Sequence, residues 1–228
     1  MGTLRLKNKK EFERLHALGM RSLSNGKFEP ALKYFTEADT LARQCGDRRK
    51  RLEALNPMAH ALWSLGEFDK AKQKLAVAAK IASELGLRDE LAIVFSNQGR
   101  LEAVKIIKQK PITKQPSALS KESLPHFTRA LNLLDGHDHL YFRYANAKHG
   151  ALVAALAQDY KKSSLLLSDG LYVAFKKSSK FDRETTYQLN PSGLDYFAAA
   201  AKLTNLGALN PASRDYKAQE KLARELVK

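Results

Sequence analysis

The stretch SLGEFDKAKQKLAVAA, residues 64–79, repeats a pattern that appears forty residues earlier as SNGKFEPALKYFTEAD, residues 24–39. The shared positions are a glycine, an aromatic residue and two alanines, namely Gly26 and Gly66, Phe28 and Phe68, Ala31 and Ala71, and Ala38 and Ala78. Gly46 and Gly86 show the same interval. A fixed period of about 20 to 50 residues is typical of proteins built from stacked supersecondary units. The period therefore predicts a repeat architecture.

Within each unit the apolar residues recur at intervals of three and four. The positions are Phe12, Leu15, Leu18 and Leu23, then Ala31, Phe35, Ala38 and Leu41, and in the second unit Leu52, Leu55, Met58 and Leu62, then Ala71, Leu75, Ala78 and Ile81. Such spacing places side chains on one face of a helix. No run rich in valine or isoleucine and bounded by turn residues competes with it. The sequence predicts an all-α protein in which each unit is a pair of helices.

The residues between the helices agree with this pattern. Gly26 and Gly66 stand where a helix ends in the left-handed conformation, which glycine adopts without strain. Pro30 follows just inside the next helix, where a missing N–H costs little. Pro57 falls inside a predicted helix, so either the helix begins there with Asn56 as its cap or it bends at the proline. We favour the bend, because residues 47–55 are also helical in pattern.

These helix pairs resemble tetratricopeptide repeats, in an extended form of about forty residues similar to kinesin light chain and G-protein-signalling adaptors. The resemblance is carried by Leu15, Leu18, Gly19, Ala31, Phe35 and Ala38, by Leu55, Met58, Ala59, Leu62, Ala71, Leu75 and Ala78, by Phe95, Gly99, Phe127 and Ala130, and by Ala147, Gly150, Ala151, Tyr160, Leu167 and Gly170. It implies a right-handed α–α superhelix of about five helix pairs in a single domain, residues 1–228. The expected repeats are approximately 8–44, 48–86, 88–135, 138–178 and 191–228, and the third pair has a long internal loop, an inserted basic segment at 109–120.

Charge is the strongest compositional feature of the 228-residue chain. Lys and Arg number 39 against 24 Asp and Glu, a formal net charge of +15. Such an excess either attracts acidic partners, namely nucleic acid, an anionic membrane or an acidic protein surface, or serves only as a solubilising surface charge. The cations that form a candidate basic rim are Arg48, Arg49, Lys50, Arg51, Lys108, Lys110 and Lys114. They are either phosphate contacts or solvated helix ends.

Cellular location is inferred from what the sequence lacks. No apolar run approaches the roughly 20 residues of a membrane-spanning helix, and no secretory signal is recognisable. The single cysteine, Cys45, forbids an intrachain disulfide and fits a reducing compartment. We expect a cytoplasmic protein without membrane insertion, with the nucleus as the alternative.

Motifs that carry chemistry are absent from the sequence. There is no HExxH, no glycine-rich phosphate loop and no CxxC. We therefore expect no catalytic residues, no cofactor and no metal site, and a protein that is not an enzyme.

The resemblance places candidate partner-binding residues on the first helix of each pair, which lines the concave face of such solenoids. The positions outside the packing signature are His16, Met20, Asn56, His60, Trp63, Asn97, Arg100, Lys148 and His149. Asparagine can bond a peptide backbone as donor and acceptor. Trp63 is either an apolar anchor for a partner or a packing residue beneath the neighbouring repeat.

The sequence thus predicts a protein-interaction scaffold that holds a peptide or helix of acidic character in its concave groove. The alternative is a factor associated with RNA or DNA that contacts phosphates through the basic rim. Self-association through the open ends of the solenoid is a further expectation.

Overall fold

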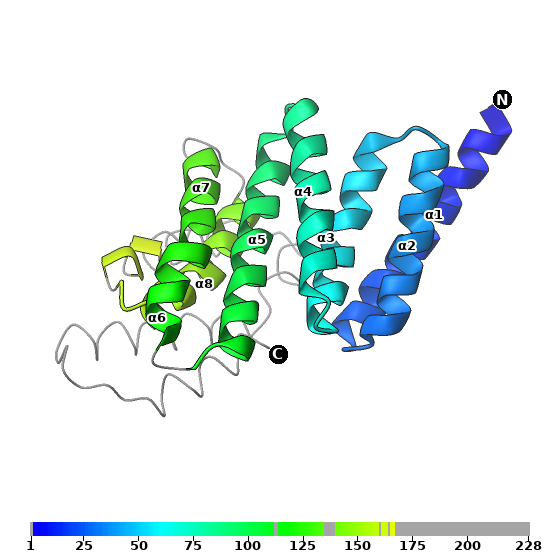
Figure 1. The fold of residues 1–228 in the computed structure, drawn as a ribbon. Coiled ribbons are helices and arrows are strands. Elements are labelled where there is room, and N and C mark those ends of the chain that lie inside the picture. Colours follow the sequence, from blue (N-terminus) through cyan, green and yellow to red (C-terminus); the bar gives the residue numbers. More distant parts are fainter. Residues whose placement is uncertain (1, 112–113, 135–139, 160, 164, 167–228) are drawn as a thin grey trace, which may run out of the picture. The chain divides into compact units, whose positions relative to one another are not determined.

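The computed structural model describes residues 2–111, 114–134, 140–159, 161–163 and 165–166 (Figure 1). Every regular element within these residues is a helix, and consecutive helices pack against each other, which confirms the predicted all-α class. The predicted fifth repeat, 191–228, and residues 167–178 of the fourth lie outside the described residues.

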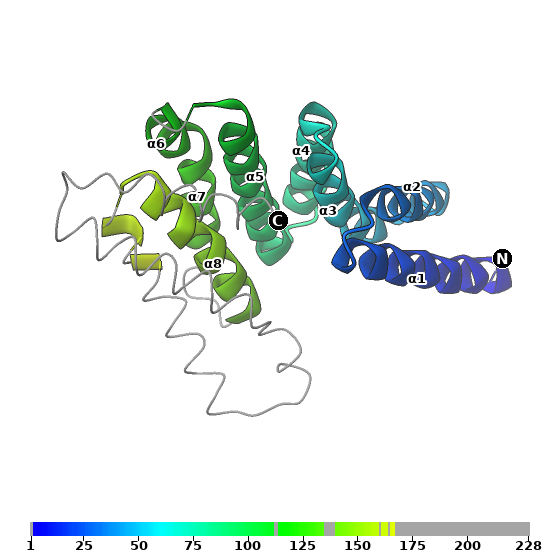
Figure 2. The same ribbon diagram turned by 90° about the horizontal axis from the view of Figure 1, so that it is seen from below.

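The chain divides into two compact units. Unit 1 is Met1–Asn97 and unit 2 begins at Gln98, so the boundary falls inside a helix, α5 (Arg88–Gln109). Unit 1 contains α1 (Gly2–Ser24), α2 (Phe28–Gln44), α3 (Arg48–Ser64) and α4 (Phe68–Glu84). Within this unit α1 packs against α2, α2 against α3 and α3 against α4, and α1 also touches α3 (Figures 1 and 2).

Four glycines end the helices of unit 1 in the same way. Gly26, Gly46, Gly66 and Gly86 have φ angles of 68°, 64°, 83° and 66°. At each one, the glycine N–H donates to the carbonyl three residues earlier, and the next N–H donates to the carbonyl five residues earlier. These are the two bonds of a Schellman cap. The left-handed glycines at 26 and 66 are confirmed. The helices α2, α3 and α4 each have 17 residues, so the second pair, α3 and α4, consists of two helices of equal length, whereas α1 of the first pair has 23 residues.

Pro57 lies within α3, which is helical from Arg48 to Ser64. The cap of this helix is Asp47, whose side chain accepts a hydrogen bond from the backbone N–H of Lys50 at 3.0 Å. The alternative in which the helix begins at Pro57 with Asn56 as its cap is therefore wrong. The helix continues through the proline, and the bend at Pro57 stays a prediction.

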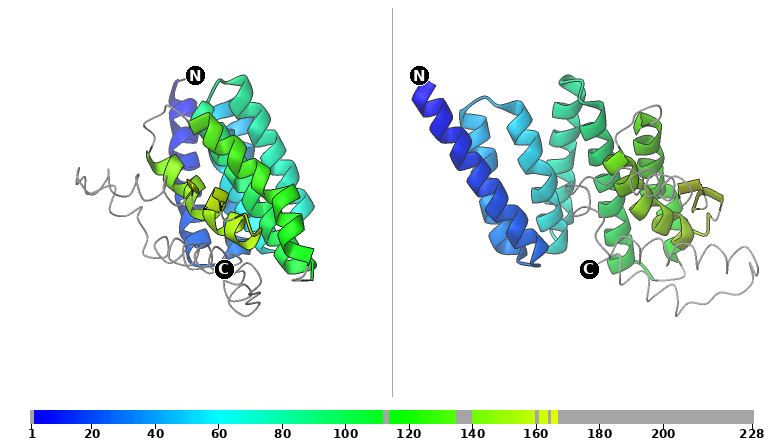
Figure 3. Two further views of the ribbon diagram at one scale, coloured as in Figure 1. Left: turned by 90° about the vertical axis from the view of Figure 1, so that its left-hand side faces the viewer. Right: turned by 180° about the vertical axis from the view of Figure 1, so that it is seen from behind.

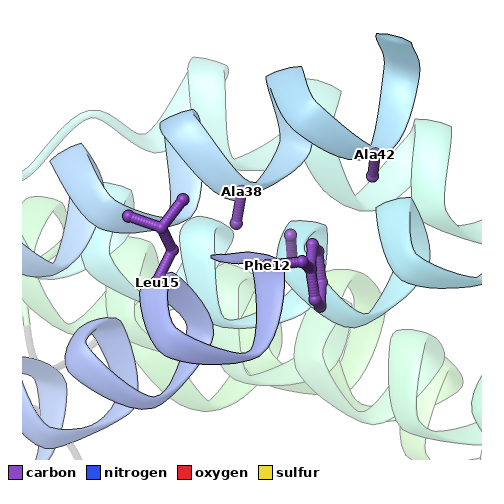
Figure 4. Close-up of a cluster of buried hydrophobic side chains, with 5 residues drawn as sticks. Phe12, Leu15, Ala38 and Ala42 are labelled. Carbon is purple, nitrogen blue, oxygen red and sulfur yellow. The ribbon is translucent and has the colours of Figure 1, made fainter. Parts of the chain in front are cut away.

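Small residues let the helices of unit 1 approach closely. Phe12 and Leu15 of α1 form one buried cluster with Ala38 and Ala42 of α2 and Ala54 of α3 (Figure 4). Alanine at the facing positions leaves room for the larger side chains of the neighbouring helix. The alanines shared by the repeats are thus packing positions.

In each of these helix pairs, a large side chain on one helix packs against a small residue on the other. A Cβ added at Gly19 would lie 2.6 Å from the Phe35 ring, and one at Gly99 would lie 2.6 Å from the Phe127 ring. At the positions equivalent to Gly19 and Phe35, the second repeat has Ala59 and the smaller Leu75, both buried. An aromatic ring is therefore combined with glycine, and leucine with alanine.

Unit 2 continues with α6 (Gln115–Ala118), a π-helical turn η2 (Leu119–Ser123), α7 (Leu124–Leu134) and α8 (Leu140–Leu156). The prediction of a loop at 109–120 is wrong for residues 115–120, which are helical and lead directly into α7 (Figures 1 and 3). Leu119 is fully buried, and the Ser123 hydroxyl donates to the Gly99 carbonyl oxygen at 2.7 Å. These contacts fold the insertion onto α5.

The end of α8 reproduces the glycine cap without a glycine. Gln158 has φ of 61°, its N–H donates to the Ala155 carbonyl, and the Asp159 N–H donates to the Ala154 carbonyl. We expect Gln158→Gly to stabilise unit 2 by about 0.5–1 kcal/mol, because glycine removes the strain of the left-handed conformation. Thermal unfolding of the variant would measure the gain. Gln158→Ala, which keeps the Cβ, serves as control, and an equal gain from it would contradict the explanation.

Candidate partner-binding surfaces

The predicted groove residues are divided between the two units. Unit 1 contains His16, Met20, Asn56, His60, Trp63 and Asn97, and unit 2 contains Arg100, Lys148 and His149. In unit 2, Arg100 and His149 are half-buried and interact with other residues of the chain. Lys148 lies on α8, and its side chain is outside the described part of the structure.

Asn56 of α3 and Asn97 of α5 are brought together. The Asn97 Nδ2 group donates a hydrogen bond to the Asn56 Oδ1 atom at 3.3 Å, and both side chains are half-buried. Within the part of the chain that the structure describes, no hydrogen bond occupies the Asn56 amide nitrogen or the Asn97 carbonyl oxygen. The pair therefore presents one donor and one acceptor side by side, the two groups that a peptide backbone pairs with.

Trp63 lies in the core of unit 1. Its side chain is 3% exposed, and its ring lies 4.9 Å from the His60 ring, centroid to centroid. The interpretation of Trp63 as an anchor presented to a partner therefore fails, and the packing alternative holds. Sequence alone left this choice open, because α3 is buried on several sides and its apolar pattern does not mark one inner face.

His16 and Met20 lie one turn apart on α1 and differ in surroundings. The His16 ring stacks on Phe12 with centroids 5.9 Å apart and meets the edge of Phe35 at 5.7 Å. It therefore covers the aromatic core of the first helix pair. Met20 is 45% exposed. Of the two, Met20 is the side chain that offers flexible apolar surface to a partner.

The four cations of residues 48–51 all form ion pairs within unit 1. Arg48 pairs with Glu84, Arg49 with Glu90 at 3.4 Å, Lys50 with Glu13 and Glu53 at 2.7 Å each, and Arg51 with Asp39 at 3.1 Å. The carboxylates come from α1, α2, α3, α4 and α5. This part of the predicted basic rim therefore joins neighbouring helices.

Lys50 is the most enclosed of these four cations, because its side chain is 21% exposed. Burial lowers its pKa, but hydrogen bonds to Glu13 and Glu53 outweigh this, and the pKa is raised. The hydrogen bond from Lys50 lowers the pKa of Glu13. The Lys50 ammonium also lies 4.9 Å from the centre of the Phe12 ring. The lysine thus couples α3 to α1 by charge and by a cation–π contact.

The remaining cations of the predicted rim belong to unit 2. The Lys110 ammonium pairs with Glu122 at 2.6 Å, and Lys108 interacts with other residues of the chain. Lys114 is exposed at the start of α6. The inserted segment is therefore less uniformly basic at its surface than its sequence suggests.

A second surface was not found from the sequence. A cleft of about 890 Å³ in unit 1 is lined by residues of α1, α2 and α3, and by residues of the turns that follow α2 and α4. Cys45 and three cations of residues 48–51 belong to its walls. Segments far apart in the chain form it, so no single sequence motif marks it.

None of the described helices combines the length and the apolar character needed to cross a membrane. Comparison with known proteins gave no match among protein-family models and none among curated proteins. The resemblance to tetratricopeptide repeats therefore rests on the residues of this chain alone.

Proposed function

We propose that the protein is a non-enzymatic interaction module of the tetratricopeptide type. In this proposal its helix pairs continue as a right-handed superhelix, and the first helices hold an extended peptide or a helix of acidic character. The observation that carries the proposal is the Asn56–Asn97 pair, because it joins first helices of successive repeats and leaves a donor and an acceptor for a peptide backbone. The net charge of +15 favours an acidic ligand.

Selection from a random peptide display library, followed by titration of a labelled selected peptide, tests the proposal. We expect Asn56→Ala combined with Asn97→Ala to weaken binding by about tenfold or more, since two hydrogen-bonding groups are lost. Gln73→Ala is the matched control, because Gln73 is an exposed amide on α4, a second helix, and it should bind as the unaltered protein does.

Equal binding by the double variant and the unaltered protein would contradict the proposed groove. The nucleic-acid alternative has a separate readout, because phosphate contacts weaken steeply with salt. If a single-stranded oligonucleotide bound more tightly than any selected peptide and lost affinity steeply with salt, the nucleic-acid alternative would replace this proposal.

A further inference from the structure

The α2–α3 and α4–α5 turns lie at the same edge of unit 1 (Figures 1 and 3). Residues of both turns line the cleft of about 890 Å³. Its hydrophobic lining consists of Phe12, Leu41, Ala42, Leu85 and Leu87. Leu85 is 40% exposed although it is a large hydrophobic residue. These apolar side chains form the floor of the cleft, and a partner can bury apolar surface against them.

Charge around this floor is mostly positive. The lining includes four cations, Lys9, Arg48, Arg49 and Lys50, and one carboxylate, Asp47. The Asp47 carboxylate is already engaged as the cap of α3. Among the described residues Lys9 is exposed and makes no ion pair. The wall of the cleft therefore complements negative charge.

The ion pairs of the wall do not close it to a ligand. The Arg49 side chain is 67% exposed and lies 3.4 Å from Glu90, and the Arg48 and Glu84 side chains are 44% and 42% exposed. Exposed ion pairs of this kind contribute little stability and exchange partners easily. A carboxylate of a ligand can therefore replace Glu84 or Glu90 at small cost.

We propose that this cleft is a second binding site, which docks an acidic amphipathic peptide segment of a partner protein. Apolar side chains of the segment bury against Leu85, Leu87 and Phe12, and its carboxylates face Lys9 and the arginines. A nucleic-acid backbone would satisfy the cations but leave the apolar floor unused, and this is why a peptide is favoured. The site uses neither Asn56 nor Asn97 and so is independent of the groove proposed above.

Cys45 provides a direct measurement of occupancy, because it is the only cysteine of the chain and belongs to the lining. The probe is a synthetic helical peptide with leucine on one face and glutamate on the other. We expect it to slow alkylation of Cys45 saturably in the full-length protein. A peptide with lysine in place of glutamate, and one with serine in place of leucine, should give no protection.

Two pairs of variants localise the site on the protein. Leu85→Gln should weaken binding of the acidic peptide about fivefold, because apolar contact is lost. Val77→Gln should leave binding of the peptide unchanged. Val77 is a matched control because it lies on α4, outside the lining, and is 39% exposed. Lys9→Gln should weaken binding of the peptide about twofold. Lys10 is the adjacent exposed lysine and lies outside the lining, so Lys10→Gln should leave binding unchanged.

Several results would overturn the second site. These are absence of protection by the acidic peptide, equal protection by the lysine peptide, an equal effect of Val77→Gln and Leu85→Gln, or stronger protection by a single-stranded oligonucleotide. Protection that persists in the Asn56→Ala, Asn97→Ala double variant would support an independent site. Loss of protection in that double variant would instead assign the binding to the groove and refute the cleft.

Discussion

Replacing Asp39 with alanine is expected to destabilise unit 1 by about 2–3 kcal/mol. The carboxylate is 4% exposed and binds two guanidinium groups, the Arg51 Nε at 3.1 Å and the Arg43 Nε at 3.3 Å. Without it, the partly buried Arg51 loses the carboxylate that compensates for its desolvation. Urea unfolding followed by Trp63 fluorescence would measure the loss, because Trp63 is the only tryptophan and is buried in unit 1.

The second repeat supplies the variant that tests this explanation. Forty residues after Asp39 and Arg51 stand Ala79 and Leu91. We therefore expect Asp39→Ala combined with Arg51→Leu to recover most of the stability lost in Asp39→Ala, since the partly buried guanidinium of Arg51 is removed together with its carboxylate. The Arg43 side chain, the other partner of Asp39, is 55% exposed and is solvated without the carboxylate. Glu11→Ala removes an exposed carboxylate that pairs with Arg14, and it should cause no measurable change. Equal effects of Asp39→Ala and Glu11→Ala would show that the Asp39 ion pairs contribute nothing.

Gly19→Ala is expected to destabilise unit 1 by a net of about 1 kcal/mol, although alanine is the better helix former. The new Cβ would lie 2.6 Å from the fully buried Phe35 ring. Overpacking of this kind costs about 1–3 kcal/mol, and here the ring has no exposed side toward which it can move. The gain in helix propensity, about 1 kcal/mol, offsets only part of the clash. The same urea titration would measure the net loss.

Phe35→Leu provides the companion variant, because Ala59 and Leu75 show that the second repeat uses alanine against leucine. Alone, Phe35→Leu leaves a cavity beside Gly19 and lowers stability. In the Gly19→Ala background it should raise stability, since leucine frees the volume that the new methyl group needs. If Phe35→Leu lowered stability equally in both backgrounds, direct packing between the two positions would be refuted.

The helices of unit 1 were predictable from the sequence because local rules define them. The glycines at 26 and 66 require a left-handed conformation that other residues rarely adopt, and the apolar residues between them recur at helical spacing. The insertion at 109–120 was misjudged for a local reason as well. Its prolines and lysines suggest a loop, and its helical state depends on the burial of Leu119 and on the bond from Ser123 to Gly99.

The residues of the candidate surfaces were predictable as a set but not in their roles. Asn56 and Asn97 were singled out by their positions in the repeat, and the structure joins them by a hydrogen bond. Trp63 was equally prominent in the sequence, yet it is buried. Periodicity tells which residues share a helix face, but not which of those faces another helix covers.

By itself the sequence determined the period, the all-α class and the caps of the helices, because each depends on residues close together in the chain. The tertiary structure decided which charges are already paired and where a cleft opens. The run at residues 48–51 is strongly basic as a sequence, but its partners Glu13, Asp39, Glu84 and Glu90 come from four other helices. Charge pairing and concavity depend on distances between segments far apart in the chain, and only the folded arrangement of the helices sets those distances.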